Sequence, residues 1–286
     1  MLYLPCYSCI IFIETNIERM VLFMPDMLNL SKEESLQMLN LRKDSFNKLC
    51  LDKTPLHNLT SRVGVVLDYS GSMSTLYRNG TVQAVLERLF PIALQFDDNG
   101  EMELWIFDDG FHRLDNISMD NYYGYIEREV IRKYDMGCTE YAPVLRDIYS
   151  KYMLEEPANL PNYIIFITDG DNSDKSAATH VITEMSKYPI FIQFVGIGSS
   201  SMNYLEELDT LGGRYVDNAN FFRIRNINSE KDEALYSKLI EEYPTWLEYP
   251  EVKEMISKQG AEPNPPLFGK PRESTEKKGF FSRFFH

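Results

Sequence analysis

The hydrophobic pattern divides the middle of the chain into short apolar runs and longer stretches with helical periodicity. After Arg62, the run VGVVLD ends in Asp68 and is followed at once by small polar residues, which is typical of a buried parallel strand. Comparable runs predict strands at 101–107, 163–168 and 190–196. Helices are predicted near 80–97, 121–133, 141–154 and 175–187, and a last helix-strand pair covers about 202–217.

This alternation of strands and helices predicts the fold class. Strands that are apolar on both faces need helices on both sides of the sheet, so we expect an α/β fold with a doubly wound, mostly parallel sheet. The sequence Asp108-Asp109-Gly110, before a short run at 111–117, is typical of a hairpin turn. The hairpin would give the sheet one antiparallel edge strand.

An amphipathic helix is predicted near the start, within residues 28–50. Ser31 and Glu34 have the spacing of a capping box, in which each side chain binds the backbone amide of the other residue. The apolar residues that follow at helical intervals are Leu36, Met38 and Leu39.

The remaining segments complete the predicted organisation. Pro244 and Pro250 interrupt a closing helical stretch, because proline is poorly tolerated inside a helix. The extension at the start contains Met20, Met24 and Met27, so translation could begin later than the first residue. We divide the chain into an extension that is mis-started or disordered (1–27), an N-terminal helical segment (28–59), the α/β domain (60–220), a C-terminal helical segment (221–260) and a flexible linker with an aromatic-basic tail (261–286).

Composition excludes some classes of partner. Asp and Glu number 43 against 29 Lys and Arg, a formal charge of -14, which matches a phosphate backbone poorly and disfavours nucleic acid. No predicted strand is followed by G-x-G-x-x-G or G-x-x-x-x-G-K-[ST], which disfavours nucleotide binding. The four cysteines include one C-x-x-C pair, Cys6 and Cys9, without a partner at zinc-finger spacing, so we expect a reduced, cytoplasmic protein.

Side-chain oxygens are predicted to gather at one edge of the sheet. Asp68, Ser70 and Ser72 follow the first strand, Thr139 precedes a helix, and Asp169 follows the strand at 163–168. Loops at the carboxyl ends of parallel strands share one edge, where ligands bind. Carboxylate and hydroxyl oxygens suit a hard cation such as Mg²⁺. If the three hydroxyls bind the ion directly and the two carboxylates act mainly through water, the ion keeps much of its positive charge and would attract an external carboxylate.

Each of these residue types also has an ordinary structural role. Taken alone, Asp68, Ser70 and Ser72 are equally typical of a turn whose side chains cap backbone amides. A hairpin turn and a solvated loop account for Asp108, Asp109 and Asp171, and a lone Cys138 is usually inert. The histidines lack the spacing of a zinc-binding helix and are not expected to be ligands; they are His57, His112, His180 and His286.

The order D-x-S-x-S, a distant Thr and a later Asp-Gly resembles the metal-ion-dependent adhesion site of the von Willebrand factor A (vWA) domain family, over roughly residues 60–220. The resemblance implies a Rossmann-like fold and a non-enzymatic module that binds a protein partner's Asp or Glu through Mg²⁺, with Mn²⁺ or Ca²⁺ as alternatives. Segments such as GCTEYAPVL are similar to bacterial vWA proteins associated with tellurite resistance, which implies a scaffold in a tellurite or chemical stress response. The implied metal ligands are Asp68, Ser70, Ser72, Thr139 and Asp169.

Two other functions compete with this interpretation. A Mg²⁺-dependent phosphohydrolase on a similar sheet would use Asp68 as nucleophile, but two residues later Ser70 stands where acid-base chemistry needs a carboxylate. The tail GFFSRFFH at 279–286 combines aromatic and basic residues and could dock on a partner groove or a membrane surface. Deleting residues 277–286 would discriminate the docking interpretation from a metal-dependent one, since loss of partners would favour docking.

Overall fold

The structure is a computed structural model of the 286-residue chain. It describes residues 30–51, 56, 58–97, 99–260 and 263–267. The predicted extension at 1–27 lies outside the described residues, as do the tail at 279–286 and most of the linker before it.

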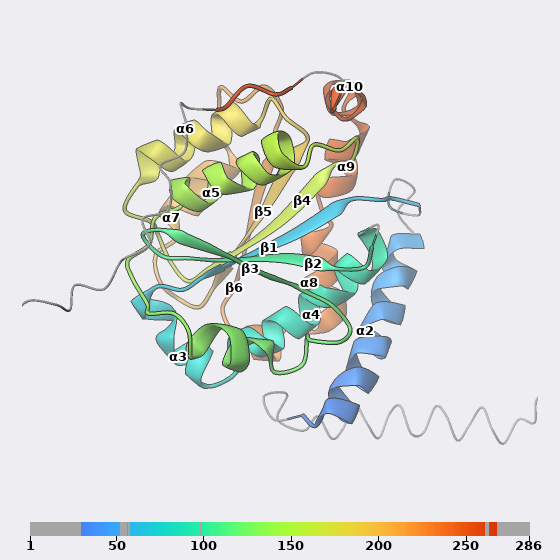
Figure 1. Cartoon of the computed structure of the whole chain (residues 1–286), viewed down its shortest axis with the longest axis vertical. Coiled ribbons are helices and arrows are strands. Elements are labelled where there is room, and N and C mark those ends of the chain that lie inside the picture. Colours follow the sequence, from blue (N-terminus) through green and yellow to red (C-terminus); the bar gives the residue numbers. More distant parts are fainter. Residues whose placement is uncertain (1–29, 52–55, 57, 98, 261–262, 268–286) are drawn as a thin grey trace, which may run out of the picture.

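The described residues form one sheet of six strands in the order β3-β2-β1-β4-β5-β6 (Figure 1). Neighbouring strands are parallel, except that β2 and β3 form an antiparallel pair at one edge. The predicted doubly wound sheet with one antiparallel edge strand is therefore confirmed. The strands are β1 (Arg62–Asp68), β2 (Met102–Phe107), β3 (Phe111–Ile117), β4 (Asn162–Thr168), β5 (Ile190–Ile197) and β6 (Ala219–Ile224).

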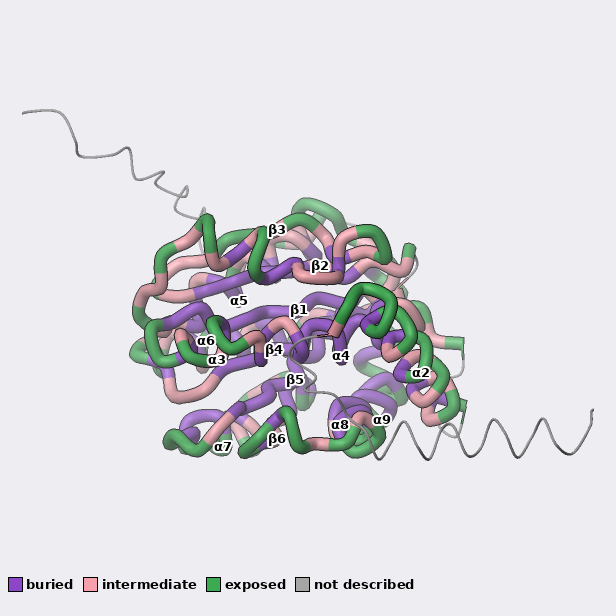
Figure 2. The backbone as a smooth tube through the Cα atoms, turned by 90° about the horizontal axis from the view of Figure 1, so that it is seen from below, coloured by how far each residue is buried: buried purple, intermediate pink, exposed green. Residues whose placement is uncertain are grey.

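Helices cover both faces of the sheet (Figures 1 and 2). One face carries α2 (Lys32–Leu51), α4 (Thr81–Phe96), α8 (Asp232–Leu239), α9 (Tyr243–Glu248) and α10 (Pro250–Lys258). The other face carries α5 (Ala142–Tyr149), α6 (Lys175–Met185) and α7 (Asn203–Asp209). The shorter elements are α3 (Ser74–Arg78), 3-10 turns at Gly71–Met73 and Ile227–Ser229, and single π-helical segments at Ile126–Ile131 and Ser150–Glu155.

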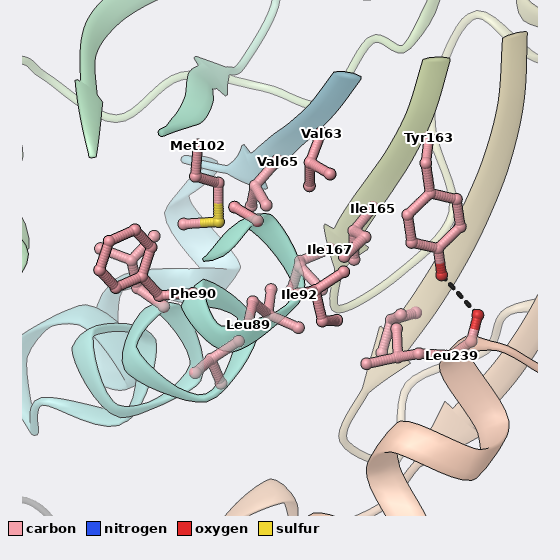
Figure 3. Packing of buried hydrophobic residues seen from close by; sticks show 14 of the residues in the cluster. Val63, Val65, Leu89, Phe90, Ile92, Met102, Tyr163, Ile165, Ile167 and Leu239 are labelled. Atoms are coloured by element: carbon pink, nitrogen blue, oxygen red, sulfur yellow. Dashed lines mark hydrogen bonds between the residues drawn. The ribbon is translucent and has the colours of Figure 1, made fainter. Parts of the chain in front are cut away.

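The strands divide their side chains between two hydrophobic cores, because successive residues of a strand point to opposite faces. In β1, Val65 and Leu67 belong to the core beneath α4, whereas Val66 belongs to the core beneath α5. Figure 3 shows the first of these cores, where the Tyr163 hydroxyl also donates a hydrogen bond to the carbonyl of Leu239. Burial on both faces fixes the register of the central strands and so fixes where each strand ends.

The capping box predicted before α2 is present. The Ser31 amide donates to Glu34 Oε2 at 2.9 Å, and the Glu34 amide donates to Ser31 Oγ at 3.3 Å. At the other end of the chain, Pro244 and Pro250 lie in the first turns of α9 and α10, so they begin new helices and interrupt the closing stretch as predicted.

The buried face of α2 differs from the prediction. Leu36 is 41% exposed, whereas Ser35 and Arg42 are buried. Ser35 donates to Glu87 Oε2 of α4 at 2.8 Å, and Arg42 donates to Asp232 Oδ2 of α8 at 3.0 Å. Hydrogen-bond partners on the neighbouring helices make these polar residues compatible with burial, and a search for apolar periodicity cannot see such partners.

The last strand begins later than predicted. The helix-strand pair was expected to end near residue 217, but β6 spans Ala219–Ile224. This strand pairs only with β5, and its residues Asn220 and Arg223 break the apolar run. An edge strand needs less continuous hydrophobicity than a central one, which explains why its sequence signal is weak. Within the described ranges, none of the helices combines the length and apolar composition that a membrane span requires.

Candidate metal centre

The predicted site lies where the direction of winding of the sheet reverses. The chain places β1 beside β4, so the loops that follow these two strands lie at the position where open α/β sheets bind ligands. Asp68 is the last residue of β1, and Ser70 and Ser72 lie in the turn that follows it. Asp169 comes directly after β4.

Asp68 is fully buried, and both of its carboxylate oxygens accept hydrogen bonds. Oδ1 accepts from the Ser70 amide at 2.8 Å, and Oδ2 accepts from Thr168 Oγ1 at 2.6 Å. The Tyr77 hydroxyl donates to the Asp68 carbonyl at 3.0 Å and fixes the backbone as well. Burial raises the pKa of Asp68 to about 6, although the hydrogen bonds from Ser70 and Thr168 oppose this shift.

Three oxygens from two loops form a continuous chain of contacts. Ser70 Oγ lies 3.0 Å from Ser72 Oγ, and Ser72 Oγ donates to Asp169 Oδ1 at 2.8 Å. Adjacent ligands of an octahedral Mg²⁺, each about 2.0 to 2.1 Å from the ion, lie about 2.8 to 3.0 Å apart. This spacing fits two edges of such an octahedron, the second of which would place Asp169 directly on the ion instead of behind a water molecule. Burial also raises the pKa of Asp169.

Ser70 does not cap a backbone amide, which was the alternative role considered for the serines. It precedes the 3-10 turn at Gly71–Met73, but its hydroxyl makes no capping hydrogen bond to that turn. Its hydroxyl instead faces Ser72. Only Asp68 among the turn residues binds a backbone amide, that of Ser70.

The loop that carries Thr139 is joined to the same edge. Gly137 forms a parallel bridge with Ser70, and its carbonyl accepts a hydrogen bond from the Gly71 amide at 3.1 Å. A Cβ added there would lie 2.5 Å from Asp109 Oδ1, so a larger residue would displace that carboxylate. Thr139 is partly exposed, and its hydroxyl forms no hydrogen bond with the described residues. The structure thus joins the Thr139 loop to the turn of Ser70 through Gly137, and it does not link the Thr139 side chain to the other four proposed ligands.

Sequence reasoning missed the residues that support this arrangement. Thr168 holds Asp68, and the buried Tyr141 donates to the carbonyl of Gly170 at 2.6 Å with its hydroxyl 3.2 Å from Thr168 Oγ1. Tyr69 turns away from the site, because its hydroxyl donates to the Tyr134 carbonyl and its ring is buried. Thr168 could have been found from its position at the end of the strand, but the tyrosines carry no local signal.

Residues left out of the predicted site have other partners or none. Asp171 pairs with Lys175 at 2.6 Å, and Cys138 is exposed as a free thiol. In the part of the chain that the structure describes, no group of three or more His, Cys, Asp and Glu side chains could hold a metal ion. The candidate centre instead combines two carboxylates with three hydroxyls, a set of oxygens that suits a hard cation and not zinc in a thiolate site.

The strand order, the helices on both faces and the Asp-x-Ser-x-Ser turn after β1 define a domain of the vWA type. The family model described as the vWA found in the TerF C terminus matches residues 60–256, well over half of the chain. The chain therefore belongs to the vWA-TerF-like family. Domains of the vWA type are in general interaction modules.

Several known proteins are similar to this chain. The uncharacterized protein YcbR of Bacillus subtilis (strain 168) is 42% identical over 250 residues, which cover 86% of this chain and 98% of YcbR. A crystal form of proximal thread matrix protein 1 from the mussel byssus matches with a TM-score of 0.50 and 16% identity, over 64% of this chain and 48% of that one. The same mussel protein, described with a zinc-occupied metal-ion-dependent adhesion site, matches at a TM-score of 0.46 and 14% identity, over 64% and 46%. The chain spans about half the length of these solved structures. At 16% identity, the first match concerns the fold alone.

Proposed function

We propose that this protein is a non-enzymatic binding module that holds one divalent cation, Mg²⁺ in the first place and Mn²⁺ or Ca²⁺ as alternatives. The ligands would be Asp68, Ser70, Ser72, Thr139 and Asp169. The observation that carries the proposal is the chain of contacts from Ser70 Oγ through Ser72 Oγ to Asp169 Oδ1, at 3.0 and 2.8 Å. These are the separations that neighbouring octahedral ligands require.

The charge of this ligand set favours an acidic partner. Only two of the five side chains are carboxylates, and hydroxyls leave the charge of a bound cation largely uncompensated. A bound cation would supply an electrophilic coordination position for an external carboxylate. The chain's own residues hold the ligands: Thr168 and the Ser70 amide orient Asp68, and Ser72 orients Asp169. The partner we propose is a protein that presents an Asp or Glu.

The setting that we propose is a bacterial tellurite or chemical stress response in the cytoplasm, where the protein acts as a scaffold. The support is membership of the vWA-TerF-like family, together with the resemblance of segments such as GCTEYAPVL to tellurite-resistance vWA proteins. The similarity to YcbR extends over nearly the whole of that protein, so the same proposal applies to both.

The proposal can be tested by calorimetric titration of Mg²⁺ and Mn²⁺ into protein treated with a chelator. The double variant Asp68→Ala with Asp169→Ala is expected to lose binding. Asp171→Ala is a matched control. It removes a carboxylate from the same loop as Asp169, but that carboxylate pairs with Lys175. Absence of metal binding in the wild-type protein would refute the site.

A capture experiment from bacterial lysate then tests the partner. Partners are expected to bind the wild-type protein in Mg²⁺, and to be lost both in chelator and in the double variant. Capture that survives chelation and the double change would assign partner binding to the helices or the tail instead of the metal site.

A further inference from the structure

The loop that carries Thr139 is tied to the loop that follows Asp169 by residues that are not metal ligands. We propose that Asp174, assisted by Ser173, is a positioning residue that holds Thr139 in place for metal binding. This inference rests on the proposed function, and it concerns the only proposed ligand whose side chain has no hydrogen bond to the described residues.

Asp174 binds a neighbouring helix and not its own. It occupies the position before α6 where an aspartate usually caps the helix that it precedes, but its side chain makes no such hydrogen bond. Its carboxylate instead accepts from the amides of Tyr141 at 2.9 Å, through Oδ1, and of Ala142 at 2.8 Å, through Oδ2. Both oxygens of Asp174 therefore bind the start of α5, two and three residues after Thr139, and Oδ1 also accepts from Asn172 Nδ2.

Three further hydrogen bonds join the same two segments. The Ser173 amide and hydroxyl both donate to the Thr139 carbonyl, at 2.9 and 3.1 Å. The Tyr141 hydroxyl donates to the Gly170 carbonyl at 2.6 Å. Five hydrogen bonds thus join the segment 139–142, which begins at Thr139, to the segment 170–174, which directly follows Asp169.

The arrangement explains how an otherwise unsupported threonine can serve as a ligand. Asp169 is held at the end of β4 and by its hydrogen bond from Ser72. Because the Thr139 loop is bound to the residues that follow Asp169, the distance between that loop and Asp169 is also defined. Groups that orient metal ligands without touching the ion typically change metal affinity by 10- to 100-fold when they are removed. Loss of the Asp174 contacts should act in this way, because Thr139 would then have to be ordered during binding.

The test compares Asp174→Asn with Asp171→Asn in Mn²⁺ and Mg²⁺ titrations of the full chain. Asparagine keeps the size of Asp174 but can accept only one of the two amide hydrogen bonds. Both variants lose one negative charge from the same loop, but Asp171 contacts Lys175 and the Tyr204 amide, not the Thr139 loop. We expect the Kd to rise about tenfold or more in Asp174→Asn, and less than about threefold in Asp171→Asn.

A double-mutant cycle shows whether the effect passes through Thr139. In a Thr139→Ala background, Asp174→Asn is expected to change the Kd little further, because the ligand that it positions is already gone. Amide hydrogen exchange at Tyr141 and Ala142 should accelerate in Asp174→Asn and not in Asp171→Asn. Ser173→Ala is a milder second variant, which should raise the Kd severalfold and provides the test if Asp174→Asn does not fold.

The outcomes separate this inference from the proposed function. A wild-type protein that binds neither ion would refute the metal site itself. A wild-type protein that binds, with equal Kd values for Asp174→Asn and Asp171→Asn, or an undiminished Asp174→Asn effect in the Thr139→Ala background, would overturn the positioning role alone. An unchanged Kd in Ser173→Ala would count against the role in the same way.

Discussion

Replacing Asp68 by asparagine should stabilise the protein in a chelator while it removes metal binding. The replacement keeps the hydrogen bonds of the buried side chain. The amide oxygen can accept from the Ser70 amide, and the amide nitrogen can donate to Thr168 Oγ1. The Thr168 hydroxyl would then donate to the Gly170 carbonyl, which lies 3.3 Å away. What changes is the buried negative charge.

The magnitude follows from the pKa of Asp68. Burial raises this pKa from its ordinary 3.8 to about 6. Between those values the folded protein keeps a proton that the unfolded chain has lost, so its unfolding free energy decreases as the pH rises through this window. Above about pH 6 the full penalty is present, and it corresponds to about 3 kcal/mol, since one pKa unit is equivalent to about 1.4 kcal/mol. Asparagine has no such penalty.

Urea unfolding in EDTA at several pH values measures this difference. The gain in unfolding free energy of Asp68→Asn should be near zero at about pH 3.5 and reach about 3 kcal/mol near pH 7, equivalent to a rise in Tm of roughly 6–12 °C. The exposed Asp120→Asn controls for the loss of one charge. A variant that is less stable than wild type at pH 7, or a gain that does not depend on pH, would refute the reasoning.

Three further changes test the site and its scaffold. The affinity for Mn²⁺ should weaken by up to about tenfold per pH unit below pH 6, because protonated Asp68 cannot serve the ion; a constant Kd from pH 5 to 7 would contradict this. Gly64→Ala should lower the unfolding free energy by about 1–3 kcal/mol in urea unfolding, since the added Cβ would lie 2.8 Å from the Tyr152 hydroxyl; unchanged stability would show that the core adjusts freely. Asp232→Ala should cost about 3 kcal/mol in the same assay, because it removes the carboxylate that forms ion pairs with the buried Arg42 and Arg88; a loss below about 1 kcal/mol would show that water replaces it.

The central sheet could be predicted from the sequence because its signals are local and strong. β1, β4 and β5 are buried on both faces and read as continuous apolar runs, and the Asp108-Asp109-Gly110 turn marks the hairpin. Strand ends follow from those runs, and they place Asp68 and Asp169 at one edge. The proximity of Ser70 and Ser72 to Asp169 was therefore predictable from topology alone.

What the sequence did not reveal depends on partners that are distant along the chain. Arg42 can be buried because it donates a hydrogen bond to Asp232 Oδ2 at 3.0 Å, and Asp232 is 190 residues away in the sequence. Asp174 would be expected to cap α6, the helix that it precedes, but the packing of α5 against α6 brings its carboxylate to the start of α5 instead. The local sequence indicates which roles a residue can take, but only the tertiary arrangement determines its hydrogen-bond partner.

The distances in the site also bear on how much the protein must rearrange to bind an ion. Ser70, Ser72 and Asp169 already hold their oxygens at the separations of an octahedral edge, so binding needs rotation of hydroxyl hydrogens away from the ion and not movement of the backbone. Thr139 is the exception, because hydrogen bonds from the described residues hold only its carbonyl and leave its hydroxyl unconstrained. If four ligands are preorganised and the fifth depends on the contacts of Asp174, then affinity is controlled mostly by the loop between Gly137 and Tyr141. Sequence changes in that loop, and not in the Asp-x-Ser-x-Ser turn, should therefore produce most of the variation in metal affinity between related proteins that keep all five ligands.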